Sequence, residues 1–274
     1  MAELLNVSLL SGADLAYVKA TILSSGVIAL RRLPQSKFRS SFIFPPPSTF
    51  IGALFYPLLR DVEKRETLYE VSQMAKRGRG GAGFEVVPRS VVEKYKCLVR
   101  NFSVRVVGEG FIDGGLLKIN WYDTHPDRME IKQAATSLPF SVYYGTSDNK
   151  FEAVYFIDVK KLEEFNISLK EIVRAAYGIS RLGSRESVVH SDFVSFGEVT
   201  IESVSETETS YSFVLDYSKS VSGNYSLQQV SDWRIEVTNP EKAPKILLAY
   251  PKGRVTVKGK VNVAKIEGDY IVVE

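Results

Sequence analysis

Two arginines and a glycine in the stretch RLGSRES, residues 181–187, could bind a phosphate group. Arg181 and Arg185 each carry a planar guanidinium that can donate two parallel hydrogen bonds to phosphate oxygens. Gly183 would let the backbone turn tightly between them, and Ser184 would add a hydroxyl donor. The alternative is an ordinary connection between a helix and a strand, with both arginines solvated.

A second candidate for anion binding is the proline-rich stretch FPPPSTFIGAL, residues 44–54. Proline suits the first position of a helix, so we predict that a helix begins at Pro47 or Ser48. A helix start offers free N–H groups and partial positive charge, and Ser48 and Thr49 would add hydroxyl donors. Four basic residues precede the stretch closely: Arg31, Arg32, Lys37 and Arg39. The alternative is a capped helix that serves only the core.

A third candidate is the basic, glycine-rich stretch KRGRGG, residues 76–81. Lys76, Arg77 and Arg79 could reach a nucleic-acid backbone by flexible electrostatic attraction. The glycines make regular helix or strand costly, so a loop or a hairpin tip is predicted. The alternative is a loop tip that binds nothing.

The net charge of the whole chain is only +3, but it is unevenly distributed. Between Arg31 and Arg105 there are 15 lysines and arginines against six aspartates and glutamates, a net charge of +9. From Ser195 to Glu274 the net charge is −2. A basic half joined to a slightly acidic half favours a polyanion such as nucleic acid on one side only. The alternative is a solvated surface of lysine and arginine.

Signals for catalysis are weak. The chain has only two histidines, His125 and His190, and it lacks HExxH, P-loop and GxSxG motifs. The single cysteine, Cys97, excludes an internal disulfide framework and a cysteine-rich zinc site, and no carboxylate cluster suggests a metal pair. We therefore predict no enzyme activity, no metal and no cofactor. An acid–base ribonuclease site of histidine with tyrosine or lysine leaves no sequence motif and stays open.

The cellular compartment is predicted from the absence of a basic leader and of a membrane-spanning stretch. The first ten residues, MAELLNVSLL, carry no basic leader, and no stretch reaches the 18 to 20 apolar residues, roughly, that a membrane helix needs. One cysteine fits a reducing compartment. We expect a soluble, cytoplasmic protein without a membrane partner.

Hydrophobic periodicity and capping signals predict the elements that must position these loops. Ser168 and Glu171 form a capping box, and Gly178 stands where a helix would end. The predicted order up to residue 200 is strand, helix, strand, strand, helix, strand. The strands are residues 17–23, 97–108, 153–159 and a strand-like run from Ser187 to Val204. The first helix begins near Pro47 and is ended or bent by Pro57, and the second helix follows Ser168. This βαββαβ order is that of a ferredoxin-like fold, which RNA-recognition domains share.

The last part of the chain reads as β-structure without a helix. Four valines alternate around Gly259, which predicts a strand with one buried face: Val255, Val257, Val261 and Val263. We place the boundary of this part between residues 195 and 210.

Two stretches together resemble a known family. FPPPSTFIGAL and GISRLGSRESVV, residues 178–189, are similar in kind, order and separation to the proline-rich segment and the glycine-arginine loop of a family of CRISPR-associated RAMP proteins. The family is the fifth Cas family, a subunit of type I Cascade complexes, and the archaeal subtype I-A is the nearest resemblance. The resemblance covers residues 15–200, roughly.

The resemblance implies an α+β fold with two domains. These are a ferredoxin-like RAMP domain, residues 1–200, and a smaller β-rich C-terminal domain, residues 201–274. A β-hairpin thumb would be inserted at about residues 67–150 and would carry or approach Lys76, Arg77 and Arg79. Family members grip the 5′ handle of crRNA, cap one end of Cascade and contact its backbone RAMP subunit and large subunit, and would meet target DNA only indirectly.

Three functions remain open at this point. The leading one is a non-catalytic subunit that binds the crRNA handle and caps the complex. The alternative is a metal-independent endoribonuclease that processes precursor crRNA, as the subtype I-C member does with tyrosine, lysine and histidine. That triad cannot be matched here residue by residue. The third is an assembly subunit whose basic face meets proteins only.

Overall fold

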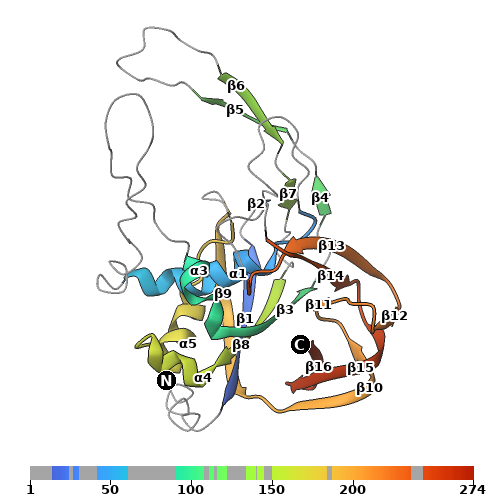
Figure 1. The fold of residues 1–274 in the computed structure, drawn as a ribbon. Coiled ribbons are helices and arrows are strands. Elements are labelled where there is room, and N and C mark those ends of the chain that lie inside the picture. The colour runs from blue at the N-terminus through green and yellow to red at the C-terminus, as the bar shows by residue number, and fades with distance from the viewer. Residues whose placement is uncertain are drawn as a thin grey trace, which may run out of the picture.

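Four strands that are far apart in the sequence form one antiparallel sheet, the central sheet, with the order β3-β8-β1-β9 (Figure 1). Their bounds are β1 Leu15–Ser24, β3 Val99–Val107, β8 Lys150–Asp158 and β9 Val189–Glu198. The computed structural model describes residues 14–24, 27–30, 42–60, 91–107, 111–113, 116–121, 134–139, 141–144, 150–183, 187–235 and 243–274.

One face of the central sheet is covered by helices. Their bounds are α1 Pro47–Phe55, η2 Tyr56–Arg60, α3 Val91–Tyr95, η3 Lys96–Leu98, α4 Val159–Glu164 and α5 Leu169–Tyr177. The apolar face of α1 is fully buried: Phe50, Ile51, Leu54 and Phe55. As predicted, the α-helix ends before Pro57, which lies in the 3-10 turn η2. No helix in the described ranges is long and apolar enough to cross a membrane.

The capping box predicted for α5 is confirmed. The Ser168 Oγ accepts a hydrogen bond from the Glu171 backbone N–H at 3.3 Å, and the Glu171 carboxylate accepts one from the Ser168 N–H at 2.8 Å. Gly178 ends the helix as predicted, but with a φ of −82° rather than in the left-handed region. A Cβ at Gly178 would lie 3.1 Å from the Cβ of Pro57. The glycine is therefore explained by the close approach of η2 to the end of α5.

The connectivity confirms the ferredoxin-like fold. Helix α1 lies between β1 and β3 in the chain, α4 and α5 lie between β8 and β9, and the sheet order places β1 and β8, the first and third of the four strands, in the centre.

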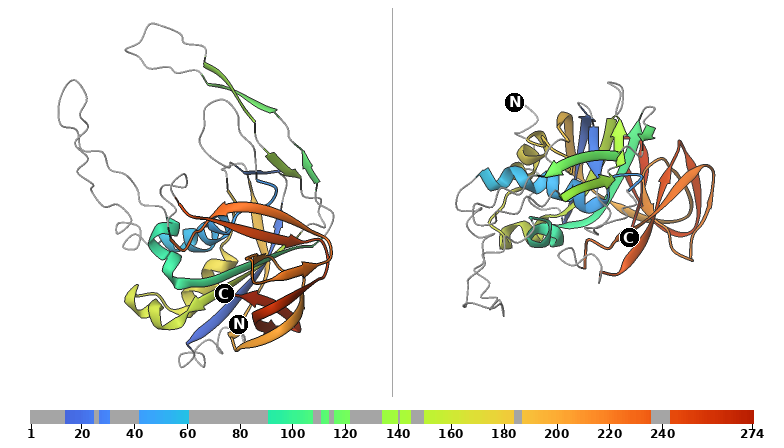
Figure 2. Two further views of the ribbon diagram at one scale, coloured as in Figure 1. Left: turned by 45° about the vertical axis from the view of Figure 1, so that its right-hand side comes forward. Right: turned by 90° about the horizontal axis from the view of Figure 1, so that it is seen from above.

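Five further strands form an arm that extends away from the central sheet (Figure 2): β2 Val27–Leu30, β4 Phe111–Asp113, β5 Leu116–Trp121, β6 Ala134–Pro139 and β7 Ser141–Tyr144. They pair as β2-β7-β4 and β5-β6. The hairpins of the expected thumb are thus β4 to β7, and β2 joins them from the segment before α1.

The strand-like run from Ser187 to Val204 divides into two strands of different sheets. β9 ends at Glu198 in the central sheet, and β10 begins at Ile201 in a sheet of the C-terminal unit, residues 201–274. In its described residues the unit contains strands alone: β10 Ile201–Thr209, β11 Phe213–Val214, β12 Ser220–Ser222, β13 Tyr225–Ser231, β14 Lys245–Pro251, β15 Val255–Ile266 and β16 Asp269–Val273. The inner C-terminal sheet has the order β10-β15-β12, with β16 paired to β15, and the outer one has the order β11-β14-β13.

The alternating valines of β15 are buried as predicted. Val255, Val257, Val261 and Val263 pack with Phe213 and Ala249 between the two C-terminal sheets. The opposite face of β15 packs toward the central sheet through Ala264 and Ile266. The strand β15 is therefore buried on both faces only near its end, at Val263 and Ala264, while Lys258 and Lys260 are exposed.

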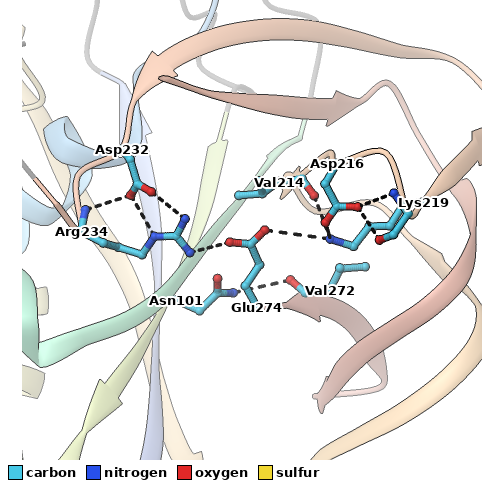
Figure 3. Close-up of polar contacts among 9 residues, drawn as sticks. Asn101, Val214, Asp216, Lys219, Asp232, Arg234, Val272 and Glu274 are labelled. Carbon is cyan, nitrogen blue, oxygen red and sulfur yellow. Dashed lines mark hydrogen bonds and ion pairs between the residues drawn. The ribbon is translucent and has the colours of Figure 1, made fainter. Parts of the chain in front are cut away.

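A chain of charged groups stabilises the last residues of the C-terminal unit (Figure 3). Arg234 binds Asp232 with two hydrogen bonds of 2.8 Å and also contacts Glu274. Lys219 lies 3.9 Å from the other carboxylate oxygen of Glu274 and 2.8 Å from Asp216. Glu274 thus links the turn after β13 to the turn before β12.

Candidate nucleic-acid interface

Four of the predicted RNA-binding residues lie in described parts of the chain: Ser48, Thr49, Arg181 and Gly183. Nine lie outside the described residues: Arg31, Arg32, Lys37, Arg39, Lys76, Arg77, Arg79, Ser184 and Arg185. The geometry of the site is therefore built from the start of α1 and from the two ends of the 181–187 loop.

The start of α1 has fewer free N–H donors than the start of a typical helix. Pro46 is the residue before the helix and Pro47 is its first residue, and neither has an N–H group. The Thr49 N–H is occupied by the Pro46 carbonyl at 2.9 Å, and no side chain caps the helix. Ser48 and Thr49 are half-buried at this end. A phosphate here would depend on the Ser48 N–H and the two hydroxyls more than on the helix dipole.

The loop with Arg181 is closed by a short antiparallel bridge. Arg181 is bridged to Val188, and the Leu182 N–H donates to the Ser187 carbonyl at 3.1 Å. Leu182 is fully buried, whereas Arg181 is exposed. Gly183 has a φ of +96°, which other residues rarely adopt, so the predicted need for glycine is confirmed. The loop thus has a fixed base and presents the Arg181 guanidinium to solvent.

Both segments lie at the same end of the central sheet, which we call the Ser24 end. At this end Ser24 pairs with Val189 and Val107 pairs with Lys150. Arg181 belongs here because its bridge partner Val188 directly precedes Val189.

The first turn of α1 contacts the sheet near the same end. Phe50 packs 5.7 Å from Phe151, which pairs with Ile22, two residues before Ser24. The arm is also rooted at the Ser24 end, because β2 starts shortly after β1 ends and β4 starts shortly after β3 ends. Four parts of the sequence therefore share this end of the sheet: the start of α1, the base of the 181–187 loop, the start of β2 and the start of β4.

The C-terminal unit covers part of the other face of the central sheet. Val154 and Phe156 of β8 are fully buried against Tyr211 and Ile271 of the C-terminal unit. RNA-recognition domains stack bases on this face of their sheet, which is open in them. Here the C-terminal unit covers β8 on this face, so bases cannot stack on that strand.

A cluster of charged groups fastens the C-terminal unit over this face. Glu152 of β8 accepts hydrogen bonds from the Tyr211 hydroxyl at 2.8 Å and from the Arg105 guanidinium, and it lies 3.5 Å from the Lys19 ammonium. Arg105 also pairs with Asp269 at 3.1 Å. Burial alone would raise the pKa of Glu152, but the hydrogen bonds from Tyr211 and Arg105 and the charges of Arg105 and Lys19 outweigh it and lower that pKa. The cluster is structural, since its cations already have carboxylate partners.

One cleft of the C-terminal unit is unsuited to a polyanion. It has a volume of about 470 Å³ and lies along β10 and β16, where four carboxylates and one arginine line it: Glu202, Glu206, Glu208, Asp269 and Arg254. Such a lining repels phosphate groups. This agrees with the charge asymmetry of the sequence.

The catalytic alternative gains little from the geometry. His190 is an exposed residue of β9, and His125 lies outside the described residues. In the part of the chain that the structure describes, no three histidine, cysteine, aspartate or glutamate side chains gather as metal ligands would.

Two groups of interactions were missed by sequence reasoning. Glu152 lies just before one predicted strand and Arg105 within another, and no local pattern pairs them with each other or with Tyr211. Gln228 of β13 binds the backbone of Ile43 and Phe44, just before the prolines. A single glutamine in a strand gives no sequence signal of such a role. Only the position of β13 beside the 42–47 segment reveals it.

Comparison with known proteins supports the fold. Neither a protein-family model nor a curated protein matches the sequence. A solved structure described as the crystal structure of a CRISPR protein from Archaeoglobus fulgidus is similar, with a TM-score of 0.57 and 15% sequence identity. The similarity covers 95% of this chain and 99% of that chain. The chain therefore shares the fold of this archaeal CRISPR protein over almost its whole length.

Proposed function

We propose that the protein binds crRNA at the Ser24 end of the central sheet, as a non-catalytic subunit that grips the 5′ handle and caps one end of a type I Cascade complex of subtype I-A. The observation that carries the proposal is that the start of α1 and the Arg181 loop lie at one end of the sheet. The arm is rooted at the same end.

Three further observations support it. The fold is shared with a CRISPR protein. The basic residues 31–39 directly precede the segment that leads to α1. The covered part of the sheet face and the acidic cleft are poor surfaces for phosphate groups, which favours the Ser24 end.

The proposed partners follow from the same arrangement. In Cascade, the backbone RAMP subunit and the large subunit would contact this protein, and target DNA would be met indirectly. The Arg181 loop would hold the RNA through the phosphates of the RNA backbone. Recognition of the handle sequence would need unstacked bases that turn toward the protein. No cofactor takes part in this binding.

Replacing Arg181 and Arg185 together by alanine is expected to weaken binding of a single-stranded RNA that carries a CRISPR 5′ handle. Each charge-assisted hydrogen bond to phosphate that the double variant loses should raise the Kd for this RNA about tenfold. The slope of log Kd against log salt concentration should fall by about one for each phosphate that the variant no longer binds. Fluorescence anisotropy at several salt concentrations measures both quantities.

Lys258→Ala with Lys260→Ala is the matched control, because it removes the same charge from exposed positions of β15. An unchanged Kd in the double arginine variant would remove the loop from the site. Absence of RNA binding by the unaltered protein would overturn the proposed function. Clean cleavage of repeat RNA in EDTA, abolished by His125→Ala or His190→Ala, would instead establish the endoribonuclease.

A further inference from the structure

One buried side-chain amide fixes the segment that leads to α1. The Gln228 Oε1 accepts hydrogen bonds from the backbone N–H groups of Ile43 at 2.7 Å and Phe44 at 2.9 Å, and its Nε2 donates to the Phe44 carbonyl at 2.9 Å. Gln228 is 7% exposed. A single amide thus satisfies three backbone groups that would otherwise need water or a strand partner. These hydrogen bonds join the segment to the C-terminal unit, 184 residues away along the chain.

A second side chain of the hairpin formed by β13 and β14 also fixes Phe44. The ring of Phe44 stacks on the ring of Tyr250 in β14, with centroids 4.5 Å apart and planes at 17°. Gln228 is opposite Leu248 in the ladder, and Leu248 and Tyr250 are two residues apart, so both side chains rise from one face of the hairpin. Phe44 is therefore fixed by a hydrogen-bonded amide and by an aromatic stack.

The three prolines between Phe44 and Ser48 stiffen the backbone, so the position of Phe44 fixes the position of the start of α1. Pro45, Pro46 and Pro47 are buried, and each has its φ locked near −65° by its ring. Few backbone torsions remain between Phe44 and Ser48. The position of the Ser48 and Thr49 hydroxyls is thus set from β13 and β14.

We propose that Gln228 is a positioning residue for RNA binding, and that the β13–β14 hairpin of the C-terminal unit sets the geometry of the RNA grip at α1 without touching RNA. The inference rests on the proposed function at the Ser24 end. It gives the acidic C-terminal unit a part in binding an RNA that its charge would repel.

The test is Gln228→Leu in the full chain, with the same handle RNA as probe. The Kd is expected to rise about tenfold at every salt concentration, while the slope of log Kd against log salt concentration stays unchanged, because the same phosphates are still bound. In the free protein, the amides of Ile43 and Phe44 are expected to exchange with deuterium at least about tenfold faster. Gln229→Leu, on the exposed face of the same strand, is the matched control and should change neither quantity.

Phe44→Leu is the second variant, since it removes the stack and keeps the amide. It should raise the Kd with an unchanged slope, even if Gln228→Leu fails to fold. Faster exchange with an unchanged Kd would overturn the positioning role and leave the proposed function standing. A reduced salt slope in Gln228→Leu would overturn it as well, because the residue would then act on a phosphate directly. If the unaltered protein binds no RNA, the proposed function fails first.

Discussion

Replacing Glu152 by alanine is expected to lower the free energy of unfolding by about 3 kcal/mol. Glu152 lies between Arg105, Lys19 and the Tyr211 hydroxyl, and the side chains of the two cations are only 24% and 11% exposed. The loss should be large because the variant removes the acceptor of hydrogen bonds from Arg105 and from the Tyr211 hydroxyl, and hydrogen bonds to a charged group contribute about 1.5 to 3 kcal/mol each. Arg105 keeps Asp269 and Lys19 keeps Glu267 as partners, which limits the loss. Urea unfolding at pH 7 measures the change.

Glu206→Ala is the matched control for this prediction. Glu206 pairs with Lys258 at 3.3 Å, but both side chains are more than half exposed. Exposed pairs contribute little, so a loss below about 1 kcal/mol is expected. Equal losses in the two variants would show that the Glu152 cluster does not fasten the C-terminal unit.

The pH dependence of the same variant gives an independent check. The pKa of Glu152 lies below its ordinary value of 4.5, because its hydrogen bonds and cation partners outweigh burial. A carboxylate with a lowered folded-state pKa stabilises the fold fully above its unfolded-state pKa, and this stabilisation is lost as the pH falls through the folded-state pKa. The difference between the unaltered protein and Glu152→Ala should therefore be constant near neutral pH and shrink below about pH 4.

Gly259→Ala is expected to destabilise the C-terminal unit by at least about 3 kcal/mol. Gly259 has a φ of +133°, and a Cβ there would lie 2.5 Å from the backbone oxygen of Ser218. The strand β15 cannot shift easily, because the flanking valines Val257 and Val261 are fully buried. The turn at Ser218 is held by the Asp216 carboxylate, which accepts hydrogen bonds from the Ser218 N–H and hydroxyl. The unfolding transition of the full chain measures the loss.

Gly268→Ala separates the two contributions to that loss. Gly268 also has a positive φ, +90°, but no atom lies within 4 Å of a Cβ built on it. Backbone strain alone should cost about 1 kcal/mol there. A similar loss at both glycines would mean that the close approach of Ser218 does not constrain β15.

Local signals in the sequence predicted the elements well. The capping box at Ser168 and Glu171, the helix end before Pro57 and the alternating valines of β15 each depend on neighbours within one or two turns or strands. Because such neighbours are near in sequence, their spacing is enough to predict the local structure. The order of these elements then led to the ferredoxin-like fold.

Interactions between distant segments could not be predicted in the same way. Alternation tells which residues share a face of a strand, but it does not tell what covers that face, so it gives no sign of the contacts among Glu152, Arg105 and Tyr211. For the same reason the role of Gln228 was invisible. Gly178 shows a milder form of this limit, because its position was predicted while its cause, the approach of Pro57, lies in another helix.

Ultraviolet crosslinking of the full chain to a 5′-handle RNA, followed by mass spectrometry of the crosslinked peptides, tests the central claim most directly. RNA at the Ser24 end should crosslink to peptides from residues 31–49 and 181–187, and the signal should fade with increasing salt. Crosslinks confined to β10, β15 and β16 of the C-terminal unit would contradict the account.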